Sequence, residues 1–522
     1  MAEKKQGLAS IITASSVGTM IEWYDFYIFG SLATIISTKF FPTDNPTAAF
    51  LSTLATFAAG FVVRPFGAIF FGRLGDLIGR KYTFMLTLLL MGGATFLIGL
   101  IPGYETIGFM APVLVLILRL LQGLALGGEY GGAATYVAEH SPAHQRGFWT
   151  SWIQTTATVG LFVSLIVIQI TQTVLGKETF EDWGWRVPFL VSILMVGVSF
   201  IIRRNMHESP LFAKAKAEGK TSTNPLKESF GNKLNFKFVL LALLGATMGQ
   251  GVVWYTGQFY ALSFLQKVMN IDLKQTNELM TIALLMGTPF FVFFGWLSDR
   301  VNRKTIMLAG MLLGVVAYRP IYRQMYETTN VANKSEIVEK TTIEEKRAAV
   351  LVDGVETADS TITTTTKKEF ADGTLLEEKK IQKVLADGSE APKAEIKKTV
   401  TINSSDKWTL IFLIFIQVLF VTMAYGPIAA FLVEMFPVKI RYTSMSLPYH
   451  VGNGIFGGLL PTIATALVVN ASKANEAAAA AGQPLPYEAP YLEGLWYPII
   501  IAAMSFVIGV VYINGKDRNI HD

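Results

Sequence analysis

Cysteine is absent from the 522 residues, and charged side chains make up only 16% of them. Without a thiol the chain can form no disulfide, no thiolate metal site and no cysteine nucleophile. In a soluble protein about a quarter of all residues are charged, so the composition argues against an ordinary cytosolic enzyme. Hydrophobic residues make up 51% of the chain, which indicates that the bilayer is its solvent.

Apolar runs of about 20 residues, the length of a helix that crosses a bilayer, recur along the chain. The first run is not a cleavable signal peptide, because Glu22 and Asp25 interrupt it and no small-residue cleavage site follows. An even number of spans would place both termini on one side of the membrane. We predict twelve transmembrane helices, near residues 10–34, 48–71, 83–101, 110–131, 149–171, 187–202, 237–264, 276–297, 305–319, 408–433, 443–468 and 494–514.

Lysine and arginine gather in every second short loop, the pattern that marks the cytoplasmic side of a membrane protein. Both termini are therefore predicted to be cytoplasmic, in a multi-pass protein of the plasma (inner) membrane. The predicted cytoplasmic basic residues are Lys4, Lys5, Arg73, Arg80, Lys81, Arg146, Arg203, Arg204, Lys214, Lys216, Lys220, Lys227, Lys233, Arg300, Arg303, Lys304, Lys439, Arg441, Lys516 and Arg518.

Two loop sequences repeat 223 positions apart. GRLGDLIGRK begins at Gly72 and GWLSDRVNRK begins at Gly295, so the first glycine, the acid and the basic pair recur at one spacing. A second pattern, a glutamate followed by proline three residues later and arginine seven residues later, occurs at Glu139 and again at Glu434. Such repeats predict two parallel six-helix halves, as in transporters built from repeats related by an axis along the membrane normal.

The same repeat locates an insertion. It would place the counterpart of Glu139 at position 362, but the counterpart is Glu434, so about 72 extra residues lie between the ninth and tenth spans, on the non-cytoplasmic side. The domains predicted from this arrangement are an N-terminal six-helix bundle (1–204), a cytoplasmic linker (205–236), helices seven to nine (237–319), the insertion (320–407) and helices ten to twelve with a cytoplasmic tail (408–522).

The insertion contains three Asp-Gly pairs, at Asp353, Asp372 and Asp387, separated by runs of alternating polarity. Asp-Gly between such runs is typical of tight β-hairpins, so we predict a small antiparallel sheet, with a disordered linker as the alternative because the aromatic content is low. The five histidines all lie outside the insertion. Zinc binding and histidine-based catalysis are therefore excluded there.

The chain resembles the major facilitator superfamily in GRLGDLIGRK at Gly72, in RLLQG at Arg119 and in WRVPF at Trp185. EWYDF at Glu22 and GGEYGG at Gly127 are similar to the metabolite:proton symporter family within it, whose members carry shikimate, 2-oxoglutarate, citrate, or proline and betaine. This resemblance implies an all-α membrane fold of twelve helices in two pseudo-symmetric halves, with no enzymatic activity and no cofactor except the proton as coupling ion.

Four ionisable side chains, Glu22, Asp25, Arg64 and Arg119, are expected at membrane depth, where each costs several kcal/mol unless it is paired or hydrated. Resemblance to sugar–proton symporters implies that Asp25 faces Arg119 and exchanges a proton as it gains and loses that arginine. Glu22 is the rival proton carrier, and a permanently ionised Asp25–Arg119 pair is the alternative. Arg64 offers a bidentate fork to a substrate carboxylate, unless it is a second partner for Glu22 or Asp25. Glu129 is expected near the cytoplasmic end.

Other polar and aromatic residues in the spans are candidates for lining a central cavity, although each could equally serve helix packing. They are Gln122, Gln154, Trp254, Tyr255, Gln258, Tyr425, His450 and Asn453.

The repeated loop residues are candidates for a cytoplasmic gate of ion pairs that breaks on inward opening. Charged helix ends can also be plain membrane anchors, but their repetition in both halves favours a gate. The candidate gate residues are Gly72, Asp76, Arg80, Glu139, Arg146, Asp299, Arg303, Glu434 and Arg441.

Together these features predict a monomeric secondary transporter in membrane lipid that imports a small organic acid or zwitterionic metabolite with protons by alternating access. We expect a small carboxylate as its substrate and no nucleic-acid partner. The alternatives are a proton-independent uniporter or exchanger of the same fold, and a membrane-anchored receptor or adhesion module that acts through the insertion. A drug–proton antiporter is disfavoured, because the fifth span lacks a Gly-Pro-Gly-Gly cluster.

Overall fold

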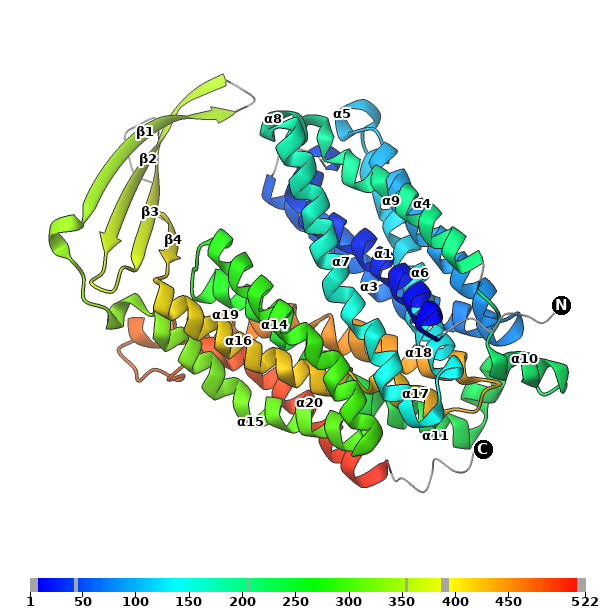
Figure 1. Ribbon diagram of the computed structural model, residues 1–522. Coiled ribbons are helices and arrows are strands. Elements are labelled where there is room, and N and C mark those ends of the chain that lie inside the picture. Colours follow the sequence, from blue (N-terminus) through cyan, green and yellow to red (C-terminus); the bar gives the residue numbers. More distant parts are fainter. Residues whose placement is uncertain (1–7, 42–45, 205, 353–354, 386–393, 514–522) are drawn as a thin grey trace.

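The computed structural model describes residues 8–41, 46–204, 206–352, 355–385 and 394–513. Apart from one sheet, the chain is helical (Figure 1). Ten helical stretches of the described residues are long and apolar enough to cross a membrane, and they coincide with the predicted spans three to twelve. Helices α1 (Leu8–Ser31) and α3 (Pro46–Leu77) occupy the first two predicted spans. The predicted twelve-helix architecture is therefore confirmed.

The N-terminal half consists of six long helices with short connecting elements. Its elements after α1 are α2 (Ala33–Phe40), α3, α4 (Arg80–Leu100), α5 (Tyr104–Ile107), α6 (Met110–His140), α7 (Arg146–Leu175), α8 (Lys177–Thr179) and α9 (Arg186–Arg204). A short helix α10 (Pro210–Ala217) follows in the linker.

The C-terminal half contains the other six spans, two of which are helices interrupted by π-helical turns. One runs through α11 (Lys233–Ala242), α12 (Met248–Tyr255) and α13 (Ala261–Ser263), and another through α18 (Arg441–Val451) and α19 (Leu460–Ala480). The remaining helices are α14 (Leu273–Arg300), α15 (Arg303–Thr329), α16 (Ser404–Tyr425), α17 (Ile428–Met435) and α20 (Trp496–Tyr512).

The insertion forms a four-stranded antiparallel sheet in the order β1 (Thr342–Val352), β2 (Val355–Glu369), β3 (Leu375–Val384) and β4 (Glu395–Thr401). The predicted hairpin turn at Asp372 joins β2 to β3, with Gly373 at a positive φ of 83°, a conformation that glycine adopts without strain. The other two predicted turns, at Asp353 and Asp387, lie outside the described residues. Helix α15 continues to Thr329, beyond the predicted start of the insertion at 320.

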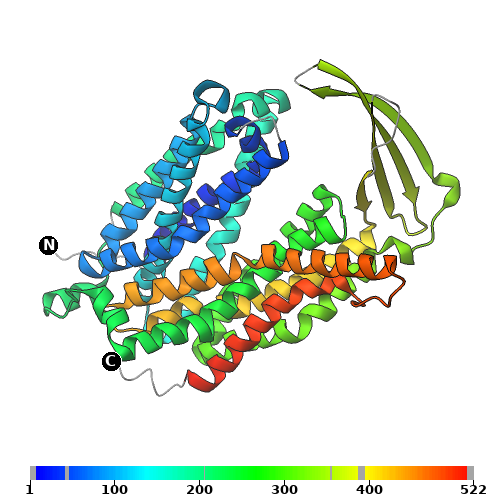
Figure 2. The same cartoon turned by 180° about the vertical axis from the view of Figure 1, so that it is seen from behind.

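The sheet is attached to the C-terminal half. The N–H of Asp272 donates to Val400 O at 2.9 Å and the N–H of Val400 donates to Asn270 O at 2.7 Å. Lys334, in the segment before β1, forms ion pairs with Asp372 of the hairpin turn and with Asp406 of α16, the latter at 2.5 Å. Figures 1 and 2 show the sheet standing at the outer end of this half, beyond α15 and α16.

Helix α9 has an exposed apolar face and a buried polar face. Leu194 and Ile201 are 69% and 64% exposed on the outer surface, whereas Ser192 and Arg203 are fully buried. The apolar face is thus turned outward, where lipid replaces water, and the polar face is turned into the bundle, where partners are available. Arg203, which the loop pattern assigned to the cytoplasmic surface, lies in the protein interior.

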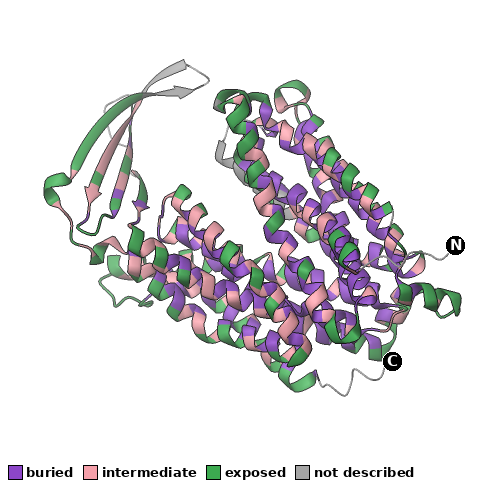
Figure 3. Cartoon of the chain, viewed as in Figure 1, coloured by how far each residue is buried: buried purple, intermediate pink, exposed green. Residues whose placement is uncertain are grey.

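The two halves converge at the end where the described helices lead to both termini, and diverge toward the end that carries α5, α8 and the sheet (Figures 1 and 2). At the converging end α18 packs against α3 and α6, and α14 packs against α7. Figure 3 shows the buried residues concentrated inside each half and where the halves meet. The candidate site lies between the halves.

Candidate functional site

A central cavity lies between the two halves. The N-terminal half lines it with Arg64 of α3 and Glu129 of α6, and the C-terminal half lines it with Tyr425 of α16 and His450 of α18. The complete lining is Thr19, Trp23, Arg64, Leu126, Glu129, Tyr130, Trp254, Tyr255, Tyr425, Tyr449, His450 and Asn453. The cavity is therefore aromatic, with a few polar and charged groups.

Arg64 is the cationic side chain of this lining. It is 4% exposed, and its guanidinium lies 4.7 Å from the ring centre of Phe26 and 4.2 Å from that of Phe61. Its Nε and one terminal nitrogen are buried without a hydrogen-bond acceptor among the described residues. A buried donor without a partner costs about 1–3 kcal/mol, and more for a charged group, so Arg64 is suited to receive an anionic ligand.

The aromatic residues are held in a fixed arrangement by contacts across the interface between the halves. The rings of Tyr130 and Tyr449 are stacked with centroids 3.6 Å apart, and the hydroxyl groups of Tyr449 and Tyr425 lie 2.6 Å apart. Gln154 donates a hydrogen bond to the Tyr130 hydroxyl at 2.8 Å. Gln154 thus orients a cavity residue and does not itself line the cavity.

Six of the nine predicted substrate-binding residues line the cavity: Arg64, Trp254, Tyr255, Tyr425, His450 and Asn453. Gln122 accepts a hydrogen bond from Arg119 at 2.8 Å and donates to Thr95 at 2.7 Å, inside the N-terminal half. Gln258 is half-buried and outside the lining. Trp23, Tyr130 and Tyr449 also line the cavity but were not predicted to do so. Trp23 lies in the EWYDF motif, Tyr130 lies in the GGEYGG motif and Tyr449 precedes His450, so these positions could have indicated them.

The expected pairing of Asp25 with Arg119 is not formed between these residues in this conformation. Asp25 accepts a hydrogen bond from Ser192 of α9 at 2.6 Å, and no ion pair joins it to Arg119 within the described part of the chain. The Arg119 guanidinium lies 4.7 Å from the ring centres of both Phe26 and Phe29. The aromatic side chains of Phe26 and Phe29 therefore cover the Arg119 guanidinium on the side of α1. Neither motif nor spacing predicted these contacts.

Glu22 instead belongs to a second buried cluster. Arg203 of α9 pairs with Glu129 of α6 at 2.6 Å and with Glu22 of α1 at 3.8 Å. Glu129, which the sequence places near the cytoplasmic end, is fully buried and lines the cavity. No single motif holds these three residues, so only the packing of three helices reveals the cluster.

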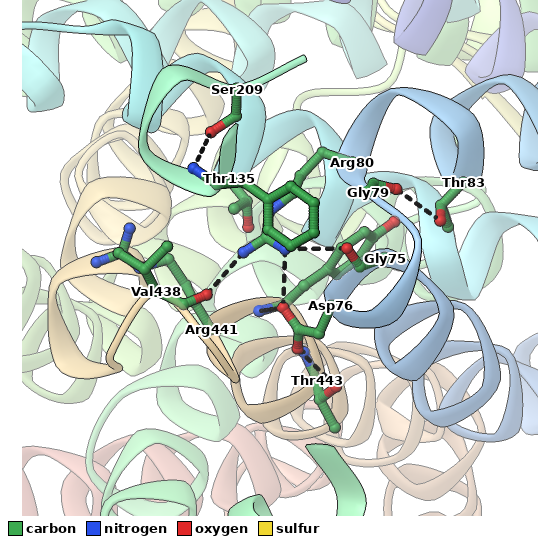
Figure 4. A network of polar contacts seen from close by, with 12 residues as sticks. Gly75, Asp76, Gly79, Arg80, Thr83, Thr135, Ser209, Val438, Arg441 and Thr443 are labelled. Atoms are coloured by element: carbon green, nitrogen blue, oxygen red, sulfur yellow. Dashed lines mark hydrogen bonds and ion pairs between the residues drawn. The ribbon is translucent and has the colours of Figure 1, made fainter. Parts of the chain in front are cut away.

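At the converging end, Asp76 joins the two halves (Figure 4). It accepts hydrogen bonds from the N–H of Thr443 at 2.8 Å and from the Thr443 hydroxyl at 2.7 Å. Thr443 lies in the first turn of α18, where backbone N–H groups lack helical acceptors and the helix dipole is positive. Asp76 thus caps a helix of the opposite half, and Arg80 neutralises it at 3.1 Å.

Arg80 and Arg441 extend this contact through one shared acid. Arg80 donates to Val438 O of the opposite half at 2.7 Å and pairs with Glu139 at 3.5 Å, while Arg441 pairs with Glu139 at 3.1 Å. Glu139 also accepts a hydrogen bond from Ser209. Ser209 and Glu208, which caps the start of α4 through Arg80 N at 3.1 Å, were not predicted.

The second repeat makes the reciprocal contact. Asp299, at the end of α14, accepts hydrogen bonds from the N–H groups of Gly147 and Phe148, both at 2.8 Å, in the first turn of α7. Arg303 pairs with Asp299 at 3.0 Å and with Glu434 at 2.9 Å, and Arg146 lies 3.9 Å from Glu434. Each half therefore provides an acid that caps a helix of the other half.

Glycines allow the halves to meet closely at this point. A Cβ at Gly72 would lie 2.9 Å from the Thr443 Cα, and a Cβ at Gly131 would lie 2.9 Å from the Tyr442 ring. The Tyr442 ring of α18 enters a slot between α3 and α6, where its hydroxyl donates to Gly128 O.

The residues that join the two halves at the converging end are called the gate cluster below. They are Asp76, Arg80, Glu139, Asp299, Arg303, Glu434, Arg441 and Tyr442.

The described residues contain no group of three or more histidine, aspartate or glutamate side chains placed to bind a metal ion. The groups that the cavity presents to a ligand are the Arg64 guanidinium, the aromatic rings and the carboxyl group of Glu129.

A family model described as "Sugar (and other) transporter" matches residues 11–235. The shikimate transporter of Escherichia coli (strain K12) is 34% identical over 315 residues, which cover 59% of this chain and 70% of that protein. The proline/betaine transporter of the same strain is 34% identical over 323 residues, 60% of this chain. This chain spans 64% of that relative's length.

Among solved structures, the fold matches the proton:xylose symporter XylE of the major facilitator superfamily, bound to 6-bromo-6-deoxy-D-glucose, with a TM-score of 0.65. The match covers 96% of this chain and 94% of the XylE chain at 14% sequence identity. At that identity the likeness concerns the fold.

Proposed function

The chain belongs to the metabolite:proton symporter family of the major facilitator superfamily, and we propose that it imports a small organic acid, or a zwitterion with a carboxylate, together with protons. Import would proceed by alternating access, with the gate cluster closing the predicted cytoplasmic end. The two parallel halves and the site between them are the arrangement that such a mechanism needs.

One observation carries the choice of substrate: the buried Arg64 guanidinium faces the central cavity with donors that no described residue satisfies. A carboxylate would accept two parallel hydrogen bonds from this fork. The cost of burying the charge is then offset by the ligand and not by the protein. A sugar has no negative charge to offer, so its hydroxyl groups would leave the guanidinium unneutralised.

The rest of the lining supports a small, partly apolar molecule. Trp254 lies 6.3 Å from both Trp23 and Tyr425, measured between ring centroids, and these rings present apolar faces with a polar edge. An aromatic wall of this kind also attracts a positively charged group through its π-electrons. The site thus suits a carboxylate with an apolar body or a zwitterion whose cation lies against the rings.

The reciprocal helix caps support alternating access. Asp76 and Asp299 bind the N-terminal turns of helices in the opposite half only while the predicted cytoplasmic ends are together. If the halves rock apart there, both caps break in the same movement. Proton binding would be coupled to this movement through buried carboxyl groups, for which Glu22 and Asp25, with Arg119 close by, are the candidates of α1.

Transport into proteoliposomes tests the proposal. Radiolabelled proline, glycine betaine, shikimate and citrate, with xylose as the uncharged comparison, are offered with and without an inward proton gradient. We expect gradient-driven accumulation of a carboxylate and none of xylose. Accumulation of a carboxylate that is unchanged when the gradient is dissipated would instead identify a proton-independent exchanger.

Arg64→Gln tests the role of the guanidinium. The variant should lose binding of the accumulated carboxylate, measured by thermal shift, because the bidentate contact is absent. Arg300→Gln is the matched control, since Arg300 is exposed and lies over the Trp296 ring at 4.1 Å, away from the cavity. Equal affinity in Arg64→Gln and the unaltered protein would refute carboxylate recognition by Arg64.

A further inference from the structure

Three charged side chains from three helices meet in the interior of the N-terminal half. Glu22 of α1, Glu129 of α6 and Arg203 of α9 are each at most 1% exposed. One terminal nitrogen of Arg203 lies 2.6 Å from Glu129 Oε1, and the other lies 3.8 Å from Glu22 Oε1. We call these three residues the carboxyl-pair cluster.

The cluster has one more acid than base. An uncompensated charge in a membrane-embedded core costs several kcal/mol, so the state with two carboxylates and one guanidinium is unfavourable by comparison with one that holds a proton. The other titratable groups that face Glu22 within the described chain are Asp25, on the same helix, and the Tyr442 phenol of α18. Asp25 would add negative charge, and neither group supplies a cation.

Hydrogen bonding divides the two carboxyl groups into unequal roles. Glu129 accepts from Arg203 at 2.6 Å and from the Thr87 hydroxyl at 2.9 Å, as an ionised carboxylate does. Both Glu22 oxygens are buried without a donor among the described residues, and the two terminal nitrogens of Arg203 bring the Glu22 and Glu129 carboxyl groups to one guanidinium. A neutral Glu22 can donate its proton to Glu129, and this donation satisfies both groups.

Arg203 is held firmly in place. It donates to Phe84 O at 2.7 Å and lies 3.4 Å from the centre of the Phe84 ring. On the side of α1, the chain has Gly18, where an added Cβ would lie 1.9 Å from an Arg203 terminal nitrogen. The fold thus leaves a space for this guanidinium between the two acids.

The cluster touches both the central cavity and the gate cluster. Glu129 and Thr19 line the cavity that contains Arg64. On the other side of Glu129, the neighbouring carbonyl of Gly128 accepts a hydrogen bond from Tyr442 of the gate cluster. A change of charge at Glu129 is therefore next to the substrate site and next to a contact that breaks when the gate opens.

We propose that Glu22 and Glu129 share one exchangeable proton over Arg203, and that this proton is the one coupled to substrate transport. Arg203 is a positioning residue, which holds Glu129 ionised and Glu22 ready to donate. When the proton leaves to the cavity through Glu129, two carboxylates share one guanidinium. This deprotonated cluster is unfavourable until another proton binds. The inference rests on the proposed symport and assigns its proton site.

The test uses the full-length protein in proteoliposomes and the carboxylate that the unaltered protein accumulates from the panel of proline, glycine betaine, shikimate and citrate. Glu22→Gln mimics the neutral acid, so we expect counterflow exchange to persist while gradient-driven accumulation falls to the level reached without a gradient. Glu22→Asp should restore part of the accumulation. Ser199→Ala, one helical turn before Arg203 and equally buried, is the control and should behave as the unaltered protein.

Arg203→Lys provides a second readout that a purely structural role would not move. Lysine keeps a positive charge but loses the fork that reaches both acids, so proton release becomes less favourable and the half-maximal pH of counterflow should rise. A lower rate with an unchanged pH profile would make Arg203 merely structural and overturn the proposal. Full gradient-driven accumulation by Glu22→Gln would overturn it as well. If the unaltered protein accumulates no carboxylate with the gradient, the proposed symport itself fails, which is a different result.

Discussion

Asp76 of α3 caps the first turn of α18 by accepting a hydrogen bond from the N–H of Thr443 at 2.8 Å, across the interface between the two halves. Asp299 of α14 makes the same kind of contact with Gly147 of α7 in the opposite direction, also at 2.8 Å. The two acids that repeat in the sequence thus perform equivalent roles in three dimensions. Both contacts join the two halves at the same end of the molecule.

Replacing Asp76 with asparagine should favour opening of the predicted cytoplasmic end. The variant loses the charge that interacts with the helix dipole and with Arg80. This charge should stabilise the closed end by about 1 kcal/mol, so its loss should raise the ratio of open to closed molecules roughly fivefold. Because the chain has no native cysteine, a single introduced cysteine reports accessibility without background. Thr135→Cys is suitable, since Thr135 is fully buried on α6 beside Met445 of the other half.

We expect a maleimide added from the predicted cytoplasmic side to react several times faster with Thr135→Cys when Asp76→Asn is also present. Asp299→Asn should act in the same direction because its contact is the symmetric one. Equal labelling rates with and without Asp76→Asn would show that this cap does not hold the gate.

The slot for Tyr442 makes a prediction about glycines. In Gly131→Ala the new methyl group would lie 2.0 Å from the Ser446 hydroxyl and 2.9 Å from the Tyr442 ring, so the halves could not meet as closely and transport should fall. Gly197→Ala is the matched control on α9, where nothing lies within 4 Å of the added carbon.

Because alanine is favoured over glycine in a helix by about 0.5–1 kcal/mol, Gly197→Ala should leave uptake unchanged and raise the thermal-unfolding temperature slightly. Uptake rates and thermal unfolding of the two variants are measured side by side. Similar uptake by both would indicate that the tyrosine slot tolerates the extra group.

The attachment of the sheet should depend on pH. Partial burial by itself would raise the pKa of Asp372, but hydrogen bonds from Lys334 and Thr374 lower it from 3.8 to about 2. A group whose pKa is lowered by folding stabilises the folded form above its unfolded pKa. This stabilisation is therefore present at neutral pH and is lost as the pH falls from about 4 toward 2.

Hydrogen–deuterium exchange of β3 and β4 checks this expectation. Exchange should accelerate over that acidic range in the unaltered protein and should already be faster at neutral pH in Lys334→Gln, which removes both ion pairs. Lys367→Gln is a suitable control, because its pair with Glu377 is long at 4.0 Å and its side chain is 53% exposed. A control that exchanges as fast as Lys334→Gln would rule out a specific attachment by Lys334.

Removal of the sheet tests whether function resides in the insertion. Replacing 342–401 with a short Gly-Ser linker should leave uptake intact, since the cavity lining and the gate cluster lie outside this range. The described residues of the sheet join the C-terminal half at one end, through hydrogen bonds, ion pairs and the buried Leu376 and Val400, so the helices that form the cavity and the gate cluster should fold without it. Loss of uptake in a well-folded deletion variant would favour a role of the sheet in the transport cycle.

Several predictions from the sequence agree with the structure, because each rests on a local pattern. Apolar length predicts helices, repeated loop residues predict two halves, and Asp372-Gly373 predicts a hairpin turn. These features depend on the chain's own backbone and on the bilayer, so short segments carry enough information. The expected Asp25–Arg119 pairing and the surface position of Arg203 depend on which helix faces are neighbours, and there the local patterns were insufficient.

The amino-acid sequence alone thus determined the class of the protein and its short list of buried charges, because a membrane core admits so few that each one stands out. Tertiary structure decided which of them are partners. Arg203 follows a run of apolar residues and precedes Arg204, so by sequence it is one of two loop cations, but the rotation of α9 turns its side chain inward toward Glu129. The rotation of a helix about its axis is set by packing against its neighbours, and that is why no linear pattern could reveal the carboxyl-pair cluster.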